Sequence, residues 1–245
     1  LTFDWNKFPK LEGDVADSWN VSSDGLTYTF KIKKGIKFHD GTPLTSKDVK
    51  ATYDRLRNPP EGVISVRKAL FSSISGITTP DDNTVVFKLS SPDAFMLDGF
   101  ASPFNAIYSA KDIAKDPKWH LKNINGTGPY KFVAHKKGES WKAEKFADFH
   151  HGDNCLDGTE SFRIKKVAEP LIGGQIMAEW RGTAPPERVL LKKEMGDNVS
   201  FQAKTLMTLW VVSLNSKTKA FQNKKVRQAI NMCIDCLLYT SPSPR

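Results

Sequence analysis

The sequence predicts a mixed α/β fold, because strand and helix patterns follow each other closely along the chain. Residues 26–38 alternate between apolar and polar side chains and place Tyr28, Phe30 and Ile32 on one face, which is typical of a half-buried strand. Residues 45–56 then show the apolar spacing of a helix. This succession excludes an all-helical and an all-strand protein.

The helix expected after this strand has a defined start and end. Thr45 and Asp48 have the Thr-x-x-acid spacing of a capping box. Val49, Tyr53 and Leu56 fall at positions i, i+4 and i+7 on one helix face, and the proline pair at 59–60 stops the run. These three residues therefore mark the apolar face of the helix.

Two pairs of strand-like segments predict antiparallel hairpins. Residues 74–79 and 84–89 flank a polar Pro-Asp-Asp-Asn loop, and residues 130–134 and 140–145 flank Lys-Lys-Gly-Glu. A short helix is expected between the hairpins, over 109–115.

The second half of the chain mixes the same two patterns. Strands are expected over 162–168, 199–204 and 206–214, and the last of these is apolar enough to be buried on both faces. Helices are expected over 185–193, which starts with prolines, and from an Asn223 cap through Asp235.

The glycines at 126–128 do not predict a nucleotide site. A phosphate-binding loop follows a strand and precedes a helix, so that amides at the helix N-terminus point toward the anion. Here the glycines precede a strand instead. We expect a tight backbone crossing at this loop and no nucleotide cofactor.

Composition predicts a folded protein with a basic surface. Hydrophobic residues make up 39% of the 245 residues and aromatic residues 11%, which is enough apolar area for a core, and no apolar run is long enough to span a membrane. The net charge of +9 comes from basic residues interleaved with acids, without an Arg-rich run or a known reader motif. We therefore expect no nucleic-acid partner.

The three cysteines do not predict a disulfide framework in a chain of this length. Cys233 and Cys236 have the spacing of a redox pair, but they fall at the expected C-terminus of a helix. The helix dipole disfavours a thiolate there. Redox chemistry is therefore the less favoured interpretation.

Histidines 150 and 151, with Asp153 and Cys155, form the one group of candidate metal ligands that the sequence suggests. Adjacent side chains diverge unless a loop folds them together. We therefore expect a solvent-exposed loop and no metal site. No nucleophile elbow or triad pattern supports catalysis, so the prediction is that the protein is not an enzyme. The alternative is a metal-dependent enzyme using His150 and His151, or a thiol-dependent one using the Cys233 and Cys236 pair.

Several blocks of residues, taken in order, resemble the family 5 extracellular solute-binding proteins, the dipeptide, oligopeptide and nickel-type receptors of ABC importers. The blocks are VADSW at 15–19, SDGLTYTFKIKKGIKFHDGTP at 23–43, DV at 48–49, GTGPYKF at 126–132 and VRQAIN at 226–231. The resemblance runs from residue 10 to residue 235. It is most specific in the first blocks and in GTGPYKF.

This resemblance implies an α/β, periplasmic-binding-protein-like receptor with two lobes, of which only the small family-specific domain and part of lobe one are present. We expect the small domain over residues 1–122 and partial lobe one over 123–236. Residues 237–245 are expected to be a non-native tail, because their proline spacing cannot continue a helix. The start of the chain reads as the middle of a folded segment, and no leader is expected in it.

The resemblance also implies a function. The protein would be the substrate-binding component of an ABC importer, capturing a peptide or similar small solute and delivering it to the membrane permease. It would work as a monomer in the periplasm or outside the membrane, where a lipoprotein anchor is an option. It would bind without chemistry and without a cofactor.

Trp210 and Arg181 are the candidate ligand contacts. An aromatic ring offers an apolar wall to many side chains, and an arginine can hold a carboxylate with two hydrogen bonds. Arg181 lies in the stretch 173–182, which departs from the usual family pattern and resembles a subgroup with Arg-Gly followed by a Pro-x-Glu-Arg helix. In the family, the acidic residue that pairs with a peptide amino terminus lies in the second lobe.

Overall fold

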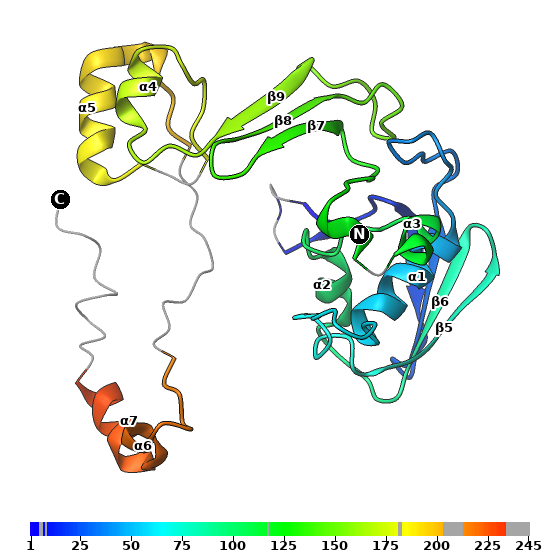
Figure 1. The fold of residues 1–245 in the computed structure, drawn as a ribbon. Coiled ribbons are helices and arrows are strands. Elements are labelled where there is room, and N and C mark those ends of the chain that lie inside the picture. The colour runs from blue at the N-terminus through cyan, green and yellow to red at the C-terminus, as the bar shows by residue number, and fades with distance from the viewer. Residues whose placement is uncertain (5–6, 8, 117, 181–182, 203–212, 234–245) are drawn as a thin grey trace. The chain divides into compact units, whose positions relative to one another are not determined.

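The computed structural model describes residues 1–4, 7, 9–116, 118–180, 183–202 and 213–233. The chain divides into two compact units, Leu1–Lys166 and Val167–Arg245. The first unit holds two antiparallel sheets of three or more strands, and the second holds helices (Figure 1). The mixed α/β class predicted from the sequence is confirmed.

The larger sheet of the first unit has the strand order β3-β4-β6-β5. Its strands are β3 (Ala16–Val21), β4 (Thr27–Ile32), β5 (Ile74–Asp81) and β6 (Thr84–Leu89), and a separate two-stranded sheet joins β1 (Thr2–Phe3) to β2 (Leu11–Glu12). Tyr28, Phe30 and Ile32 of β4 are each about 5% exposed or less. The predicted alternation and the predicted β5–β6 hairpin are confirmed.

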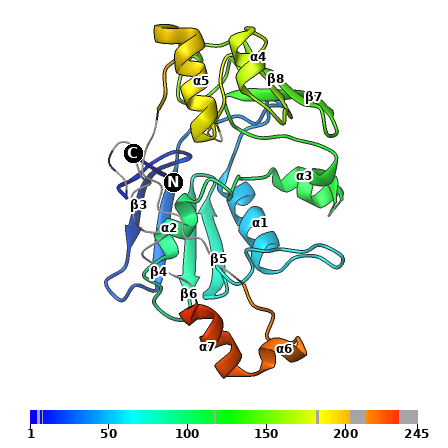
Figure 2. The ribbon, with the colours of Figure 1, turned by 90° about the vertical axis from the view of Figure 1, so that its left-hand side faces the viewer.

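Helix α1 (Ser46–Arg57) lies across one face of this sheet (Figure 2). Tyr53 of α1 meets three phenylalanine rings edge-on, with centroid distances of 5.1 Å to Phe71, 5.2 Å to Phe87 and 5.3 Å to Phe100. Phe100 belongs to α2 (Met96–Ala101). Each such aromatic pair is worth roughly 0.5–1.5 kcal/mol beyond its buried area, so this cluster joins two helices to the sheet.

Asp48, in the first turn of α1, holds a third helix in place. Its Oδ2 accepts hydrogen bonds from the Thr45 backbone N–H at 2.8 Å and from the Thr45 hydroxyl at 3.1 Å. Its Oδ1 accepts from the Ala110 N–H at 2.8 Å, at the start of α3 (Ala110–Lys115). The predicted capping box is therefore present, and the same carboxylate also docks the predicted short helix.

The smaller sheet has the strand order β7-β8-β9, formed by β7 (Tyr130–Lys136), β8 (Ser140–Lys145) and β9 (Gly158–Phe162). The β7–β8 hairpin that the sequence predicts is confirmed. The strand expected over 162–168 is wrong, because β9 ends where that range begins. Phe162 pairs with Ser140, the first residue of β8, so a longer β9 would have no partner on β8.

The second unit contains α4 (Ala168–Ile172), α5 (Pro185–Met195), α6 (Lys219–Gln222) and α7 (Lys224–Met232). Short 3-10 turns lie at Trp119–Leu121 in the first unit and at Gly196–Asn198 in the second. The helix predicted from residue 185 is confirmed. The Asn223 cap is confirmed as well, since its side-chain oxygen accepts from the Lys225 N–H at 2.9 Å.

Two strands expected in the second unit are only partly testable. Residues 199–202 are not in a strand, so that part of the prediction is wrong. Residues 203–212, which carry most of the expected strand over 206–214, lie outside the described residues.

The expected domain division remains a prediction. The boundary between the two compact units falls between Lys166 and Val167 in the sequence. The family resemblance places domain boundaries after residue 122 and after residue 236 instead. Strand β4 pairs with β3 and β6, both within the first 122 residues, as the predicted small domain requires. Within the described residues, every helix is too short or too polar to cross a bilayer.

Replacing Asp48 by Ala should lower the free energy of unfolding by about 2–4 kcal/mol, because a capping interaction and the part-buried Ala110 N–H lose their acceptor. Urea unfolding followed by circular dichroism measures this. Asp82→Ala is the matched control, since Asp82 pairs with Lys47 at the surface with 66% of its side chain exposed, and such pairs contribute about 0–1 kcal/mol. Equal losses in the two variants would contradict the account.

Candidate functional site

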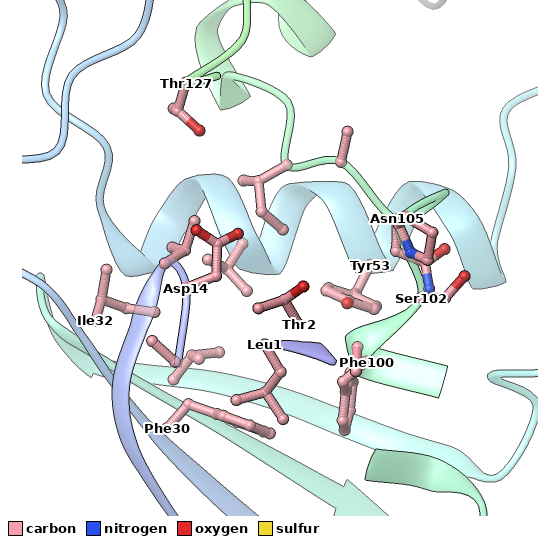
Figure 3. Close-up of a pocket in the computed structure, with 18 of the residues that line it drawn as sticks. Leu1, Thr2, Asp14, Phe30, Ile32, Tyr53, Phe100, Ser102, Asn105 and Thr127 are labelled. Atoms are coloured by element: carbon pink, nitrogen blue, oxygen red, sulfur yellow. The ribbon is translucent and has the colours of Figure 1, made fainter. Parts of the chain in front are cut away.

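A cavity of about 380 Å³ lies between the larger sheet and helix α1 in the first unit (Figure 3). Its lining is largely aromatic and aliphatic, with a few polar groups at the edges. Six of the lining residues are Phe30, Tyr53, Phe87, Phe100, Asn105 and Thr127. An apolar hollow of a few hundred Å³ with a small number of polar groups is the usual form of a small-molecule site.

Asn105 is the polar group of most interest in this lining. Its amide nitrogen donates to the Gly99 carbonyl at 2.6 Å, which fixes the orientation of the side chain. Its Oδ1 is buried and has no hydrogen-bond partner among the described residues. A buried acceptor without a partner costs about 1–3 kcal/mol, so an N–H group that reached Oδ1 after a small shift of the Asn105 side chain would be stabilised here.

The 126–128 loop, part of the cavity wall, is fixed by His39. The Gly126 N–H donates to His39 Nδ1 at 3.4 Å, and His39 Nε2 lies 3.0 Å from the Gly128 carbonyl oxygen. Only the neutral ring with its proton on Nε2 makes both contacts. Burial lowers the pKa of His39 below its usual 6.5, which agrees with this neutral form. A Cβ atom at Gly126 would come no closer than 3.6 Å to the His39 ring, and one at Gly128 would meet nothing within 4 Å, so the tight backbone approach expected from these glycines is not present.

A buried amide and carboxylate hold the other side of this loop. Asn125 donates to Asp112 at 2.7 Å, and the Asp40 N–H donates to the Asn125 side-chain oxygen at 3.3 Å. Asp112 lies on α3, is 1% exposed and also accepts from Lys115 at 2.7 Å. Burial alone would raise the pKa of Asp112, but its hydrogen bonds with Asn125 and Lys115 hold that pKa below its usual value. The loop is thereby attached to α3.

A second polar group lies at the opposite end of the cavity from Asn105, where Asp14 lines the wall (Figure 3). Asp14 Oδ1 lies 3.0 Å from His150 Nε2 and 2.8 Å from His151 Nε2. Burial would raise the pKa of Asp14, but the hydrogen bonds from the two imidazoles outweigh it and hold the pKa at about 2. The carboxyl group is therefore ionised at neutral pH.

The two histidines thus do not diverge, contrary to the expectation from the sequence. The loop folds them together, and their ring centroids are 4.4 Å apart. Their sequence neighbours do not join them: Asp153 pairs with Lys145 at 2.6 Å, and Cys155 is exposed. The third residue of the cluster is Asp14 instead of Asp153 or Cys155. Asp14 is 136 residues from His150, so no local sequence pattern connects the two.

Several predicted residues lie outside the described structure. Trp210, Arg181 and Cys236 fall in undescribed segments, so the ligand-binding roles of the first two remain predictions. Cys233 is exposed at the C-terminal end of α7, the place in the helix that the sequence predicted for it.

Comparison with known proteins identifies the family. The model of the bacterial extracellular solute-binding proteins, family 5, matches residues 10–238, so the chain belongs to this family. The resemblance seen in the sequence blocks is confirmed.

Two relatives illustrate the range of similarity. The glutathione-binding protein GsiB of Pectobacterium atrosepticum is 32% identical over 237 residues, which cover 95% of this chain and 45% of that protein. A putative ABC transporter peptide-binding protein of Brucella ovis is 44% identical over 133 residues, covering 52% of this chain and 24% of that protein. The chain thus spans about half the length of the glutathione-binding relative.

Solved structures give the same result. The periplasmic binding protein DppA of Helicobacter pylori, in complex with the peptide STSA, matches with a TM-score of 0.79 and 28% identity over 97% of this chain and 50% of its own. The oligopeptide-binding protein AppA of Bacillus subtilis, in complex with a nonapeptide, matches with a TM-score of 0.61 and 29% identity over 66% of this chain and 34% of its own. The fold is that of part of a two-lobed receptor.

His39 should make stability depend on pH. Its pKa is lowered on folding, so the unfolded chain takes up the proton first, and stability falls as the pH drops below about 6.5. His39→Gln keeps a neutral donor and acceptor at this position but does not titrate. Melting temperatures between pH 7.5 and 5 should fall less steeply for His39→Gln than for the unmodified chain, while His135→Gln, at an exposed histidine, should change little. If the melting temperatures of the unmodified chain and of His39→Gln followed the same pH profile, a neutral His39 ring holding the 126–128 loop would be refuted.

Gly13 should be required for the bend that places Asp14. A Cβ atom at Gly13 would lie 2.4 Å from the Ala16 carbonyl oxygen, so the backbone must shift. We expect Gly13→Ala to cost about 1–3 kcal/mol of unfolding free energy. In Gly76→Ala the new methyl group meets no atom within 4 Å. Chemical denaturation of both variants tests this, and an unchanged Gly13→Ala midpoint would show that the bend tolerates a side chain.

Proposed function

We propose that this chain is the solute-capturing part of a substrate-binding protein of an ABC importer, and that its cavity forms one wall of the binding cleft. The observation that carries this is Asn105, which lines the apolar cavity and whose buried Oδ1 has no partner among the described residues. A solute with an N–H group beside an apolar side chain would pair with Asn105 Oδ1 and fill the apolar cavity. Peptides fit this description, because each backbone N–H lies next to a side chain.

Membership of a solute-binding family supports this proposal, as do the ligands named for its relatives. Two of the similar structures hold peptides, the tetrapeptide STSA and a nonapeptide, and a further relative is named for glutathione. We therefore propose a peptide or a similar small solute as ligand and a membrane permease as the receiving partner. Capture takes place outside the cytoplasmic membrane, with the receptor acting as a monomer.

The proposed activity is binding without chemistry. The alternative predicted from the sequence is a thiol- or metal-dependent enzyme. A thiol-dependent enzyme would need a cysteine pair with an activated thiolate. Cys233 is exposed at a helix C-terminus, and its expected partner Cys236 lies outside the described residues. The relatives are named as binding proteins, which favours the receptor.

One wall should not suffice for tight binding. Sites for small molecules cover most of the ligand surface, and a solvent-exposed ion pair contributes only about 0–1 kcal/mol, whereas a micromolar complex needs about 8 kcal/mol. We expect isothermal titration of the 245-residue chain with mixed di- to nonapeptides to show no micromolar binding. Saturable micromolar binding by this chain would mean that the cleft lies wholly within it.

A chimera tests the function itself. Residues 1–232 would replace the matched region of the Pectobacterium glutathione-binding protein, which supplies the remaining half. We expect this chimera to bind peptides or glutathione at micromolar concentration, and Asn105→Leu to weaken binding by about tenfold or more, because one hydrogen bond is lost. Asn123→Leu, at an exposed asparagine, is the matched control. A monomeric chimera that melts cooperatively but binds no such ligand would contradict the proposal.

A further inference from the structure

We propose that Asp14, His150 and His151 form a binding site for a divalent first-row transition cation, for which Zn²⁺ serves as the probe. One carboxylate oxygen and two imidazole nitrogens, all within 4.8 Å of one another, constitute the donor set. This site does not depend on the proposed receptor function and is tested separately from it.

The distances between the donor atoms suit a shared metal ion. Two ligands bonded to one Zn²⁺ at about 2.0–2.1 Å lie roughly 2.9–3.4 Å apart for angles between about 90° and 110°. The observed separations of Asp14 Oδ1 from the Nε2 atoms of His150 and His151 are 3.0 and 2.8 Å. These two separations already match a shared ion, and the two imidazole nitrogens, which lie within 4.8 Å of each other, would be drawn together by turning of the half-exposed His151 ring.

The backbone is built to bring the two adjacent imidazoles together. The Phe149 N–H donates to the Phe146 carbonyl at 3.3 Å and the Gly152 N–H to the Phe149 carbonyl at 3.1 Å, so two turns follow each other. Gly152 has φ +98°, which favours glycine. The Phe149 ring packs against both imidazoles, with centroid distances of 4.9 Å to His150 and 5.5 Å to His151. The pair is thus held before any ion binds.

The donor chemistry matches borderline transition cations. Two imidazoles and one carboxylate are the ligand types that Zn²⁺ and its first-row neighbours take, whereas Ca²⁺ and Mg²⁺ prefer sites made of oxygen atoms alone. In each ring the Nε2 proton moves to Nδ1 when Nε2 binds the ion, so both imidazoles stay neutral. His150 Nδ1 has no hydrogen-bond partner among the described residues, so no described group fixes the opposite tautomer.

The site is closed on one side and open on the other. The His150 side chain is 9% exposed, whereas those of Asp14 and His151 are 38% and 42% exposed. Three protein ligands leave the fourth position of a tetrahedral Zn²⁺ site free. Water or a donor atom of a solute would fill that position from the open side.

An ion bound here would join two distant parts of the first unit. Asp14 follows β2, and the histidine turn follows β8, so that Asp14 and His150 are 136 positions apart in the sequence. An ion that binds only the folded state stabilises it by mass action. Zinc should therefore raise the melting temperature of the chain, and loss of any one of the three ligands should weaken that effect.

Isothermal titration with ZnCl₂ tests the site, using chelator-treated chain in which Cys155, Cys233 and Cys236 are replaced by Ser so that thiolates cannot bind the metal. We expect one Zn²⁺ per chain at micromolar affinity or tighter, and a rise in melting temperature on addition of zinc. Asp14→Asn, His150→Gln and His151→Ala should each weaken binding about tenfold or more. His135→Ala, which removes an exposed imidazole outside the cluster, should leave binding unchanged.

His151→Ala is the decisive variant, because His151 is exposed and its removal leaves the buried ring of His150 in place. Circular dichroism verifies that each variant is folded. The proposal is overturned if the chain shows no saturable 1:1 binding, or if a folded His151→Ala binds zinc as tightly as the chain does. It is equally overturned if His135→Ala weakens binding as much as His151→Ala.

Discussion

The packing of Tyr53 against Phe87 and Phe100 is the contact on which the rest of the first unit depends. It fixes α1 on the sheet and so determines where the first turn of α1 lies. Two polar contacts then position the next elements: Asp48 in that turn accepts a hydrogen bond from the start of α3, and Asp112 on α3 accepts one from Asn125. Two hydrogen bonds to β5 support this packing at the ends of α1: the Ser46 hydroxyl donates to the Asp81 carbonyl at 2.6 Å, and Arg57 donates to the Ile74 carbonyl at 2.6 Å. Loss of the aromatic packing would leave α1 held by its ends and would weaken each of the contacts that follow from it.

The same succession of contacts places the groups that can meet a solute. The loop held by Asn125 and His39 forms part of the cavity wall, and β7 begins directly after it. A polar network that is nearly satisfied is rigid, and a rigid wall needs no ordering when a ligand arrives. Among the described residues that line the cavity, Asn105 is the one with a buried polar atom that lacks a hydrogen-bond partner. Such an atom gives a ligand a hydrogen bond to make in a wall whose other buried side-chain polar atoms are already paired.

Much of the fold could be predicted because the patterns that specify it are local. The alternation of Tyr28, Phe30 and Ile32 and the Thr45–Asp48 spacing each depend on residues a few positions apart. The end of β9 could not be predicted, because it depends on where β8 begins. The sequence suggested the histidine pair but not its partner Asp14, since their meeting depends on a turn and on contacts across 136 residues. The long-range acceptor role of Asp48 was missed for the same reason.

A crystal structure of the peptide-bound chimera tests the central claim, that this cavity is one wall of a solute cleft, most directly. We expect a peptide group within the cavity, with an N–H within hydrogen-bonding distance of Asn105 Oδ1 and an apolar side chain against Phe100. A peptide that contacts none of the residues lining the cavity, while water or another part of the chain fills it, would contradict the claim.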